Sequence, residues 1–122
     1  MPAATIMIQG TTSSAGKSLL CAGLCRLFHQ DGFRVAPFKA QNMSTKSAMT
    51  AGGGEISVSQ AFQAIAAKVE PTVDMNPILL KPLGDMTSEI ILAGKSIGQI
   101  YAAEYRDKYV GAALECIERS YH

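Results

Sequence analysis

The sequence predicts an α/β domain in which a mainly parallel sheet is flanked by helices. Residues 4–9, ATIMIQ, form a short β-capable run that ends at Gly10. Residues 17–30 follow at once and carry apolar side chains at helical spacing. Further apolar runs of strand length, at 33–38 and 88–94, alternate with helical patterns. Strands that alternate with helices favour parallel pairing, with helices packed on the faces of the sheet.

The elements follow one another in a simple order. A helix over 17–30 ends at the Asp-Gly pair 31–32, and FRVAPF, 33–38, is a second strand that stops at a polar segment. The rest of the chain divides into a loop at 39–54, a helix at 56–69, a proline-broken stretch at 71–85, a strand at 88–94 and a long amphipathic helix at 97–121.

Composition limits the size and the class of the protein. The 122 residues are 48% hydrophobic and 17% charged, which is enough for one modest core. Eleven basic and ten acidic side chains give a net charge of +1 without a basic cluster, so nucleic acid is not favoured as a partner. No apolar run approaches the roughly 20 residues of a membrane span, and no secretory leader pattern occurs. The three cysteines do not have the spacing of a disulfide framework, which suits a reducing compartment, so we expect a cytoplasmic protein.

The stretch IQGTTSSAGKSLL, 8–20, has the pattern of a phosphate-binding loop. A loop between a buried strand and a helix N-terminus points successive N–H groups at one spot, where the helix dipole also favours negative charge. Gly10 and Gly16 permit close backbone approach, Lys17 can reach terminal phosphates, and the Ser18 hydroxyl can ligate Mg²⁺. A serine-rich turn that merely caps the helix is the alternative.

We therefore expect ATP and Mg²⁺ as cofactors. The expected nucleotide-binding residues are Gly10, Thr11, Thr12, Ser13, Ser14, Ala15, Gly16, Lys17 and Ser18. Five residues separate Gly10 from the Gly-Lys pair, one more than in the common phosphate loop.

This spacing resembles the dethiobiotin synthetase-like branch of phosphate-loop NTPases. Within that branch, four further blocks resemble the cobyric acid synthase family in order and spacing. The blocks are APFKAQNMS at 36–44, TAGGGEIS at 50–57, QAFQAIAA at 60–67 and VDMNPILLKP at 73–82. The resemblance covers about 5–95, and the last helix carries no assigned motif. Where the family has Gly-Arg-Ala after GGEI, this chain has Ser57, Val58 and Ser59, and it has PFKAQ where PFKPQ is more usual.

The resemblance implies ATP-dependent amidation of corrinoid side-chain carboxylates, with ammonia drawn from glutamine in a second domain. Because a carboxylate is a poor electrophile, ATP would convert it to an acyl phosphate, and catalysis would consist largely of positioning and charge stabilisation. The family reaction takes adenosylcobyrinic acid a,c-diamide to cobyric acid, in cobalamin biosynthesis.

The resemblance also implies roles for individual residues. Lys17, Lys39 and Lys81 would be catalytic cations, with Lys39 facing the transferred phosphate and the substrate carboxylate. Ser18 and Glu55 would ligate the metal. Gln41, Asn42 and Asn76 would orient the substrate.

Plainer readings stay open for several of these residues. Lys39 could be a solvated lysine and Glu55 a first-turn glutamate that complements a helix dipole. Gln41, Asn42 and Asn76 could be turn residues that close backbone hydrogen bonds. Cys21, Cys25 and His29 share one helical face, and packing is the favoured interpretation of that spacing. Tyr101, Tyr105 and Tyr109 repeat the spacing and favour a packing or interface stripe.

Two parts of such an enzyme are not found in the sequence. No acidic strand follows the last helix, and no cysteine lies in a glutaminase-type turn. We therefore expect residues 1–122 to be the N-terminal portion of one ATP-binding domain, inactive alone, whose unpaired strand edges would favour homo-oligomers. A dethiobiotin synthetase-like ligase, or a non-catalytic partition or switch ATPase, is the alternative, although the latter usually carries an additional lysine early in the loop.

Overall fold

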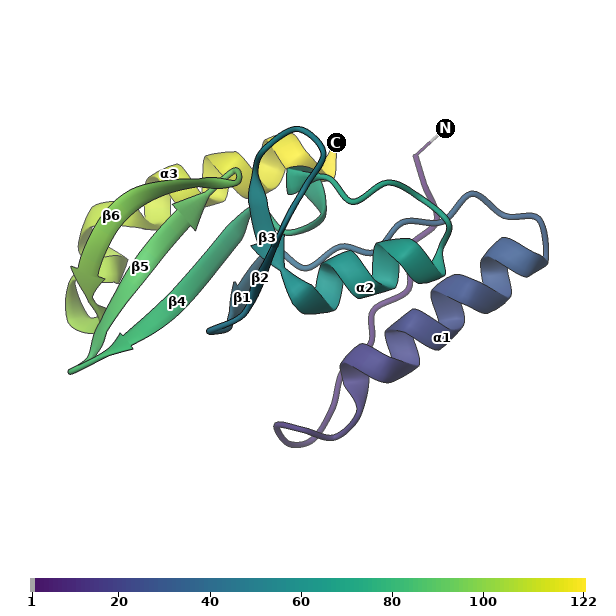
Figure 1. Cartoon of the computed structure of the whole chain (residues 1–122), viewed down its shortest axis with the longest axis horizontal. Helices are drawn as coiled ribbons and strands as arrows, with labels where there is room; N and C mark the ends of the chain where they lie inside the picture. Colours follow the sequence, from purple (N-terminus) through teal and green to yellow (C-terminus); the bar gives the residue numbers. More distant parts are fainter. Residues whose placement is uncertain (1) are drawn as a thin grey trace.

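The computed structural model describes residues 2–122 and combines one four-stranded sheet, one two-stranded sheet and three α-helices (Figure 1). The helices are α1 (Lys17–Gln30), α2 (Val58–Ala66) and α3 (Ala102–Tyr121), with a short 3-10 helix, η1 (Val73–Met75). The strands are β1 (Gln41–Met43), β2 (Ser47–Met49), β3 (Glu55–Ser57), β4 (Ile78–Gly84), β5 (Thr87–Leu92) and β6 (Lys95–Tyr101).

The larger sheet has the strand order β1-β4-β5-β6. β1 and β4 pair in parallel, with Gln41 opposite Ile78, whereas β4-β5 and β5-β6 are antiparallel. β2 and β3 form a separate antiparallel pair. The α/β class is thus confirmed, and the larger sheet is mixed.

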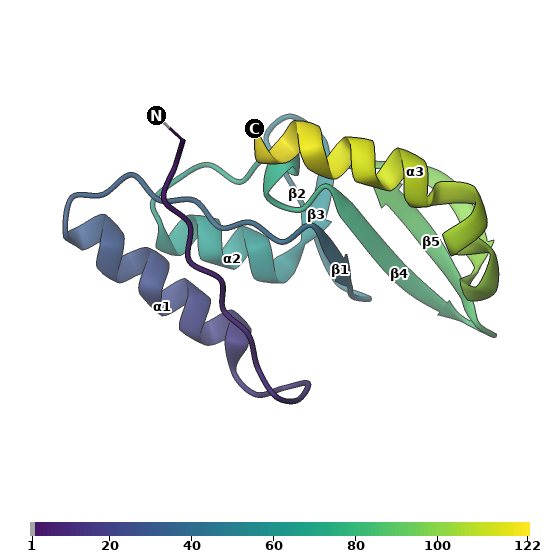
Figure 2. The ribbon, with the colours of Figure 1, turned by 180° about the vertical axis from the view of Figure 1, so that it is seen from behind.

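The core lies between this sheet and α3, which covers one of its faces (Figure 2). Because side chains alternate along a strand, Ile78 and Leu80 of β4 reach the same face. There they pack with Ile90 and Ile100 of the neighbouring strands and with Ala113 of α3. This cluster fixes the position of β4, beside which β1 lies.

The helices predicted over 17–30 and 56–69 are confirmed as α1 and α2, which pack against one another (Figure 1). Ser57 is the N-cap of α2, and its hydroxyl accepts from the backbone N–H of Gln60, at 3.4 Å. Ser57 and Gln60 have the spacing of a capping box. Ser57 therefore starts this helix.

Two predicted strands, 4–9 and 33–38, are wrong for this structure, because both segments are irregular. A strand exists only when a neighbour completes its hydrogen-bond ladder, and within residues 2–122 neither segment has one. Ile6 and Met7 are 66% and 78% exposed, and Phe33 is 63% exposed. Apolar pattern alone does not supply the missing neighbour.

The second half of the chain holds more strand than predicted. Residues 97–101 belong to β6, so the last helix begins at Ala102. β4 arises inside the proline-broken stretch and tolerates Pro82 because its register shifts between Pro82 and Gly84. Short strands β1 and β2 occur in the segment predicted as loop, and the strand predicted at 88–94 is confirmed as β5.

Candidate nucleotide-binding site

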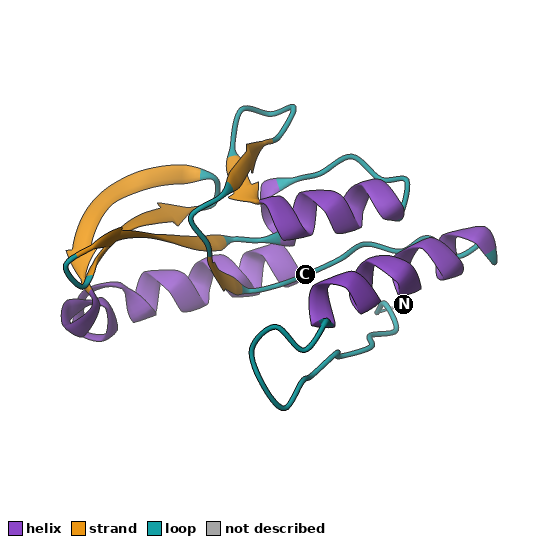
Figure 3. Ribbon diagram, turned by 60° about the horizontal axis from the view of Figure 1, so that its bottom comes forward, coloured by secondary structure: helices purple, strands orange, loops and turns teal. Residues whose placement is uncertain are grey.

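The loop at 10–16 projects from the body of the protein directly before α1 (Figure 3). Every residue from Gly10 to Gly16 is exposed, so nothing within residues 2–122 covers the loop. Gly16 has φ 94 and is the N-cap of α1 without a side-chain cap hydrogen bond. The left-handed φ favours glycine, and the first N–H groups of the helix remain open to an anion or to water.

Lys17 lies inside the curve of this loop. Its Nζ donates to the carbonyl oxygen of Thr12 at 2.9 Å. A Cβ at Gly10 would lie 3.0 Å from Cδ and Cγ of Lys17 and 3.1 Å from its Nζ. Glycine at position 10 therefore leaves the space that the lysine occupies, and the loop holds the lysine whose ammonium group reaches phosphate in loops of this pattern.

Lys39 lies next to β1 and is held at three points. Its backbone N–H donates to the carbonyl of Met75 at 2.9 Å, and its own carbonyl accepts from Nδ2 of Asn76 at 3.1 Å. Its Nζ donates to Oδ1 of Asn42 at 3.2 Å, and the side chain is otherwise exposed. The ammonium group is thus fixed in direction but accessible to a ligand.

Asn76 is 1% exposed, and its amide is engaged with the backbone. Its Oδ1 accepts from the N–H of Ser57 at 3.0 Å, and its Nδ2 donates to the carbonyls of Lys39 and Ile78. It therefore holds together the start of α2, the start of β4 and the segment that bears Lys39. A direct contact between Asn76 and substrate stays a prediction.

Glu55 and Lys81, predicted separately, form one ion pair with 2.5 Å between Oε1 and Nζ. The hydroxyl of Ser47 also donates to Oε1 of Glu55. The hydrogen bond from Lys81, followed by that from Ser47, lowers the pKa of Glu55, and the hydrogen bond to Glu55 raises the pKa of Lys81. Glu55 could join Mg²⁺ only by exchanging or sharing these partners.

Gln41 is exposed on β1, and its Oε1 accepts from the hydroxyl of Tyr105 at 2.8 Å. Burial raises the pKa of Tyr105, so its phenol stays a donor across the working pH range. α3, for which the sequence offered no motif, thus orients one candidate substrate residue. Within residues 2–122 Tyr101 is exposed, whereas Tyr105 and Tyr109 stack on each other beside the core.

Sequence reasoning missed the buried glutamines of α2. Gln60 and Gln63 are 2% and 4% exposed, and both hydrogen-bond to residues near the candidate site. The available signal was two amides spaced i, i+3 on a helix whose other inward residues, such as Ala61 and Ala64, are small and apolar. Glutamine side chains on a buried face require hydrogen-bond partners.

A surface cavity of about 310 Å³ was also not predicted. It is lined by Thr50–Gly54, Glu70–Val73, Ala93 and Lys95, and none of the nucleotide-loop residues borders it. The side chain of Val73 packs against Gly54 and Gly94, and a Cβ on either glycine would collide with Cγ1 of Val73. The triple glycine thus permits close packing of β3 against the turn between β5 and β6.

The cysteines of α1 are packing residues. Cys25 is buried, and burial followed by the neighbouring Cys21 raises its pKa to about 11. His29 is exposed. Over residues 2–122, no three His, Cys, Asp or Glu side chains gather where they could hold a metal ion.

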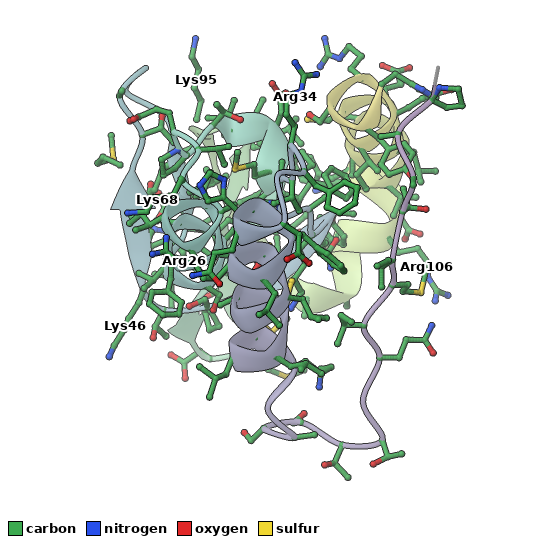
Figure 4. All side chains as sticks on the ribbon, turned by 90° about the vertical axis from the view of Figure 1, so that its right-hand side faces the viewer. Arg26, Arg34, Lys46, Lys68, Lys95 and Arg106 are labelled. Carbon is green, nitrogen blue, oxygen red and sulfur yellow. The ribbon has the colours of Figure 1, made fainter. Side chains whose placement is uncertain are left out.

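Basic side chains are spread over separate elements and point outward, as Figure 4 shows for Arg26, Arg34, Lys46, Lys68, Lys95 and Arg106. None of the helices described in residues 2–122 combines the length and apolarity required to cross a membrane.

A glycine-bracketed loop that wraps around a lysine at the start of a helix, on an α/β scaffold, defines a phosphate-loop nucleotide-binding domain. The chain belongs to the CobQ/CobB/MinD/ParA nucleotide binding domain family, which matches residues 6–115. No solved structure matches the chain.

Curated relatives bear the name cobyric acid synthase. The protein from Sorangium cellulosum (strain So ce56) is 58% identical over 120 residues, which are 98% of this chain and 23% of the relative. The protein from Synechococcus elongatus is 55% identical over 117 residues, and the one from Marinomonas sp. (strain MWYL1) is 53% identical over 122. The chain spans about a quarter of the length of these relatives.

Proposed function

We propose that the natural protein that carries this chain uses ATP to amidate side-chain carboxylates of a corrinoid, taking adenosylcobyrinic acid a,c-diamide to cobyric acid. The names of the relatives supply the substrate class. The observation that carries the nucleotide part is the loop wrapped around Lys17, in which a side chain at position 10 would crowd that lysine. The reaction is a glutamine-dependent ligation that forms a C–N bond, as in cobalamin biosynthesis.

The loop would hold the β- and γ-phosphates. Lys17 would exchange its hydrogen bond with Thr12 for one with phosphate, and the exposed Ser18 hydroxyl would ligate Mg²⁺. When bound, ATP supplies the phosphoryl group that turns a carboxylate into an acyl phosphate, from which ammonia displaces phosphate.

Lys39 and Lys81 would stabilise the charge on the transferred group. Lys39 suits this role because Asn42 fixes its direction while the ammonium stays open. Lys81 is paired with Glu55, so the pair would bring one cation and one metal-ligating carboxylate together. Gln41, Asn42 and Asn76 would orient the corrinoid carboxylates and amides, Asn76 through the backbone that it holds.

We propose that residues 1–122 form the N-terminal portion of a single ATP-binding domain and that a glutaminase domain elsewhere in the natural protein supplies ammonia. The apolar residues left exposed along α1 support the first part, because Leu19, Leu20 and Leu27 are 72%, 55% and 56% exposed. Ile6 and Met7 are exposed as well, and the remainder of the domain, or a second copy, would cover such apolar side chains. A cytoplasmic location is part of the proposal.

The test is a product assay on the full-length protein. We expect amidated corrinoid, detected by mass spectrometry, in the presence of MgATP and glutamine. The product should disappear when ATP is omitted and when Lys17 is replaced by alanine. Lys46→Ala, on an exposed lysine remote in sequence from the loop, is the control and should leave the yield unchanged. An undiminished yield from Lys17→Ala would overturn the proposal for the loop.

A further inference from the structure

α2 carries two buried amides one turn apart, Gln60 and Gln63, which are 2% and 4% exposed, and Gln63 reaches α1. Taking an amide out of water is costly unless it keeps its hydrogen bonds, so the partners of each atom show what the side chain does. Both glutamines use their oxygen and their nitrogen.

Their hydrogen bonds form one continuous series between two parts of the candidate site. Lys39 Nζ donates to Asn42 Oδ1 at 3.2 Å, and Asn42 Nδ2 donates to Gln60 Oε1 at 3.0 Å. Gln60 Nε2 donates to Gln63 Oε1 at 3.4 Å. Gln63 Nε2 then donates to the backbone carbonyl of Ser18 at 3.2 Å. We call these four bonds the amide relay.

The amide relay runs in one direction. Each of its three amides accepts with oxygen and donates with nitrogen, in the sense from Lys39 toward Ser18. Flipping one amide would place donor against donor at one end and acceptor against acceptor at the other. The Ser57 hydroxyl adds a second donor to Oε1 of Gln60, which fixes that amide further. Aligned hydrogen bonds polarise one another, so the four bonds strengthen one another.

The two ends of the relay are two parts of the candidate site, the first turn of α1 and Lys39. Ser18 is in the first turn of α1, next to Lys17, and Lys39 lies beside β1 in the other half of the protein. The two glutamines in the middle of the relay are buried and hydrogen-bond only to other residues of the protein. Apolar side chains of similar size would fill the α1–α2 contact without the cost of burying amides.

We infer that Gln60 and Gln63 are positioning residues that hold Lys39 and the first turn of α1 at a fixed separation, an inference that rests on the function proposed above. Gln60 acts on Lys39 through Asn42, and Gln63 acts on the phosphate loop through the Ser18 carbonyl. A misplaced cation loses transition-state stabilisation without losing nucleotide binding.

The experiment uses the full-length protein and compares turnover with MgATP binding. Gln60→Met should lower kcat about 10-fold while the Kd and the stoichiometry for MgATP, measured by calorimetry, stay within about 2-fold. Gln63→Met should weaken MgATP binding by about 3-fold to 10-fold, because it releases the first turn of α1. Gln30→Met, at the exposed end of the same helix α1, is the control and should change neither quantity.

A second variant keeps the test decisive if methionine disturbs folding. Gln60→Glu retains the size and the acceptor oxygen for Asn42 but cannot donate to Gln63, so it should keep more kcat than Gln60→Met. Unchanged kcat in both Gln60 variants, or a kcat that falls only in proportion to the MgATP stoichiometry, would overturn the inference. If Lys39→Ala also retains full turnover, the proposed role of Lys39 fails together with the relay. If Lys39→Ala abolishes turnover, only the relay fails.

Discussion

The ammonium group of Lys39 is oriented by Asn42 and is still accessible to a ligand. Both properties bear on how the loss of Lys39 should change turnover. Its Nζ has Asn42 as a partner on one side, and the rest of the group is exposed. A cation of this kind can bind the ground state or act mainly on the transition state, and kinetics separate the two roles.

We expect Lys39→Ala in the full-length protein to lower kcat by about 100-fold or more while changing the KM for ATP by less than about 3-fold. Steady-state kinetics at saturating glutamine and corrinoid measure both quantities. An unchanged kcat with a raised KM would mean that Lys39 binds the nucleotide in the ground state and does not act on the transition state.

The Glu55–Lys81 pair predicts a pH dependence of stability. The pKa of Glu55 is lowered in the folded state, so its contribution is present above the ordinary carboxyl pKa and is lost as the pH falls through the lowered value. The pKa of Lys81 is raised, so its contribution is lost only at high pH.

Wild type should therefore be more stable than Lys81→Met at neutral pH by about 1 kcal/mol, and the difference should shrink at about pH 3. Urea unfolding at both pH values measures it. Lys108→Met removes the exposed Glu104–Lys108 pair, whose atoms are 3.6 Å apart, and should change stability much less. A difference that persists in acid would mean that Lys81 stabilises through packing alone.

Among the elements, α2 begins at a residue with two roles. Ser57 caps the helix and also donates to Oε1 of Gln60. The cap thus begins the helix and also orients the first amide of the relay.

We expect Ser57→Ala to cost about 1 kcal/mol of unfolding free energy, in the range of about 0.5 to 2 that N-caps contribute. Ser59→Ala, two residues further along the same helix, is the matched control. Equal losses from the two variants in urea unfolding would contradict the capping role.

The elements that were predicted well from the sequence are helices with their own hydrophobic periodicity and a strand whose pairing neighbours lie within the described residues. α1 and α2 have strong helical spacing, and β5 has both neighbours present. The segments 4–9 and 33–38 have a strand pattern, but a ladder depends on a partner that no local pattern supplies. β4 was missed because Pro82 argues against a strand, and the bulge that accommodates it is visible only in the paired structure.

The same distinction applies to the candidate site. The phosphate loop could be predicted because its residues are contiguous, from Gly10 to Ser18. The pairing of Glu55 with Lys81 and the path from Lys39 to Ser18 join residues far apart in sequence, and their geometry follows from the packing of α2. Sequence named the ends of the relay but not the two glutamines between them.

In the molecule as a whole, apolar side chains of α1 and of the N-terminal segment are exposed. The chain matches only about a quarter of the length of its relatives, and further parts of such a protein would cover these side chains. Transition-state stabilisation needs every charged group in one site closed to water. The exposed loop does not meet this condition by itself.

We therefore expect the 122-residue chain alone to amidate no corrinoid carboxylate, even with MgATP and an ammonium salt in place of glutamine. Mass spectrometry of the corrinoid after incubation tests this. Amidated product that Lys17→Ala abolishes would show that these residues suffice for the reaction.

If residues 10–18 form a nucleotide-binding loop, the loss of Lys17 should weaken the binding of MgATP, which calorimetric titration measures. Wild type should bind, and Lys17→Ala should bind about 10-fold to 100-fold more weakly, because a charge-assisted hydrogen bond to phosphate contributes about 1.5 to 3 kcal/mol. Circular dichroism should show that both proteins keep the same helix content. Equal affinity of the two folded proteins for MgATP would mean that residues 10–18 do not form the nucleotide-binding loop.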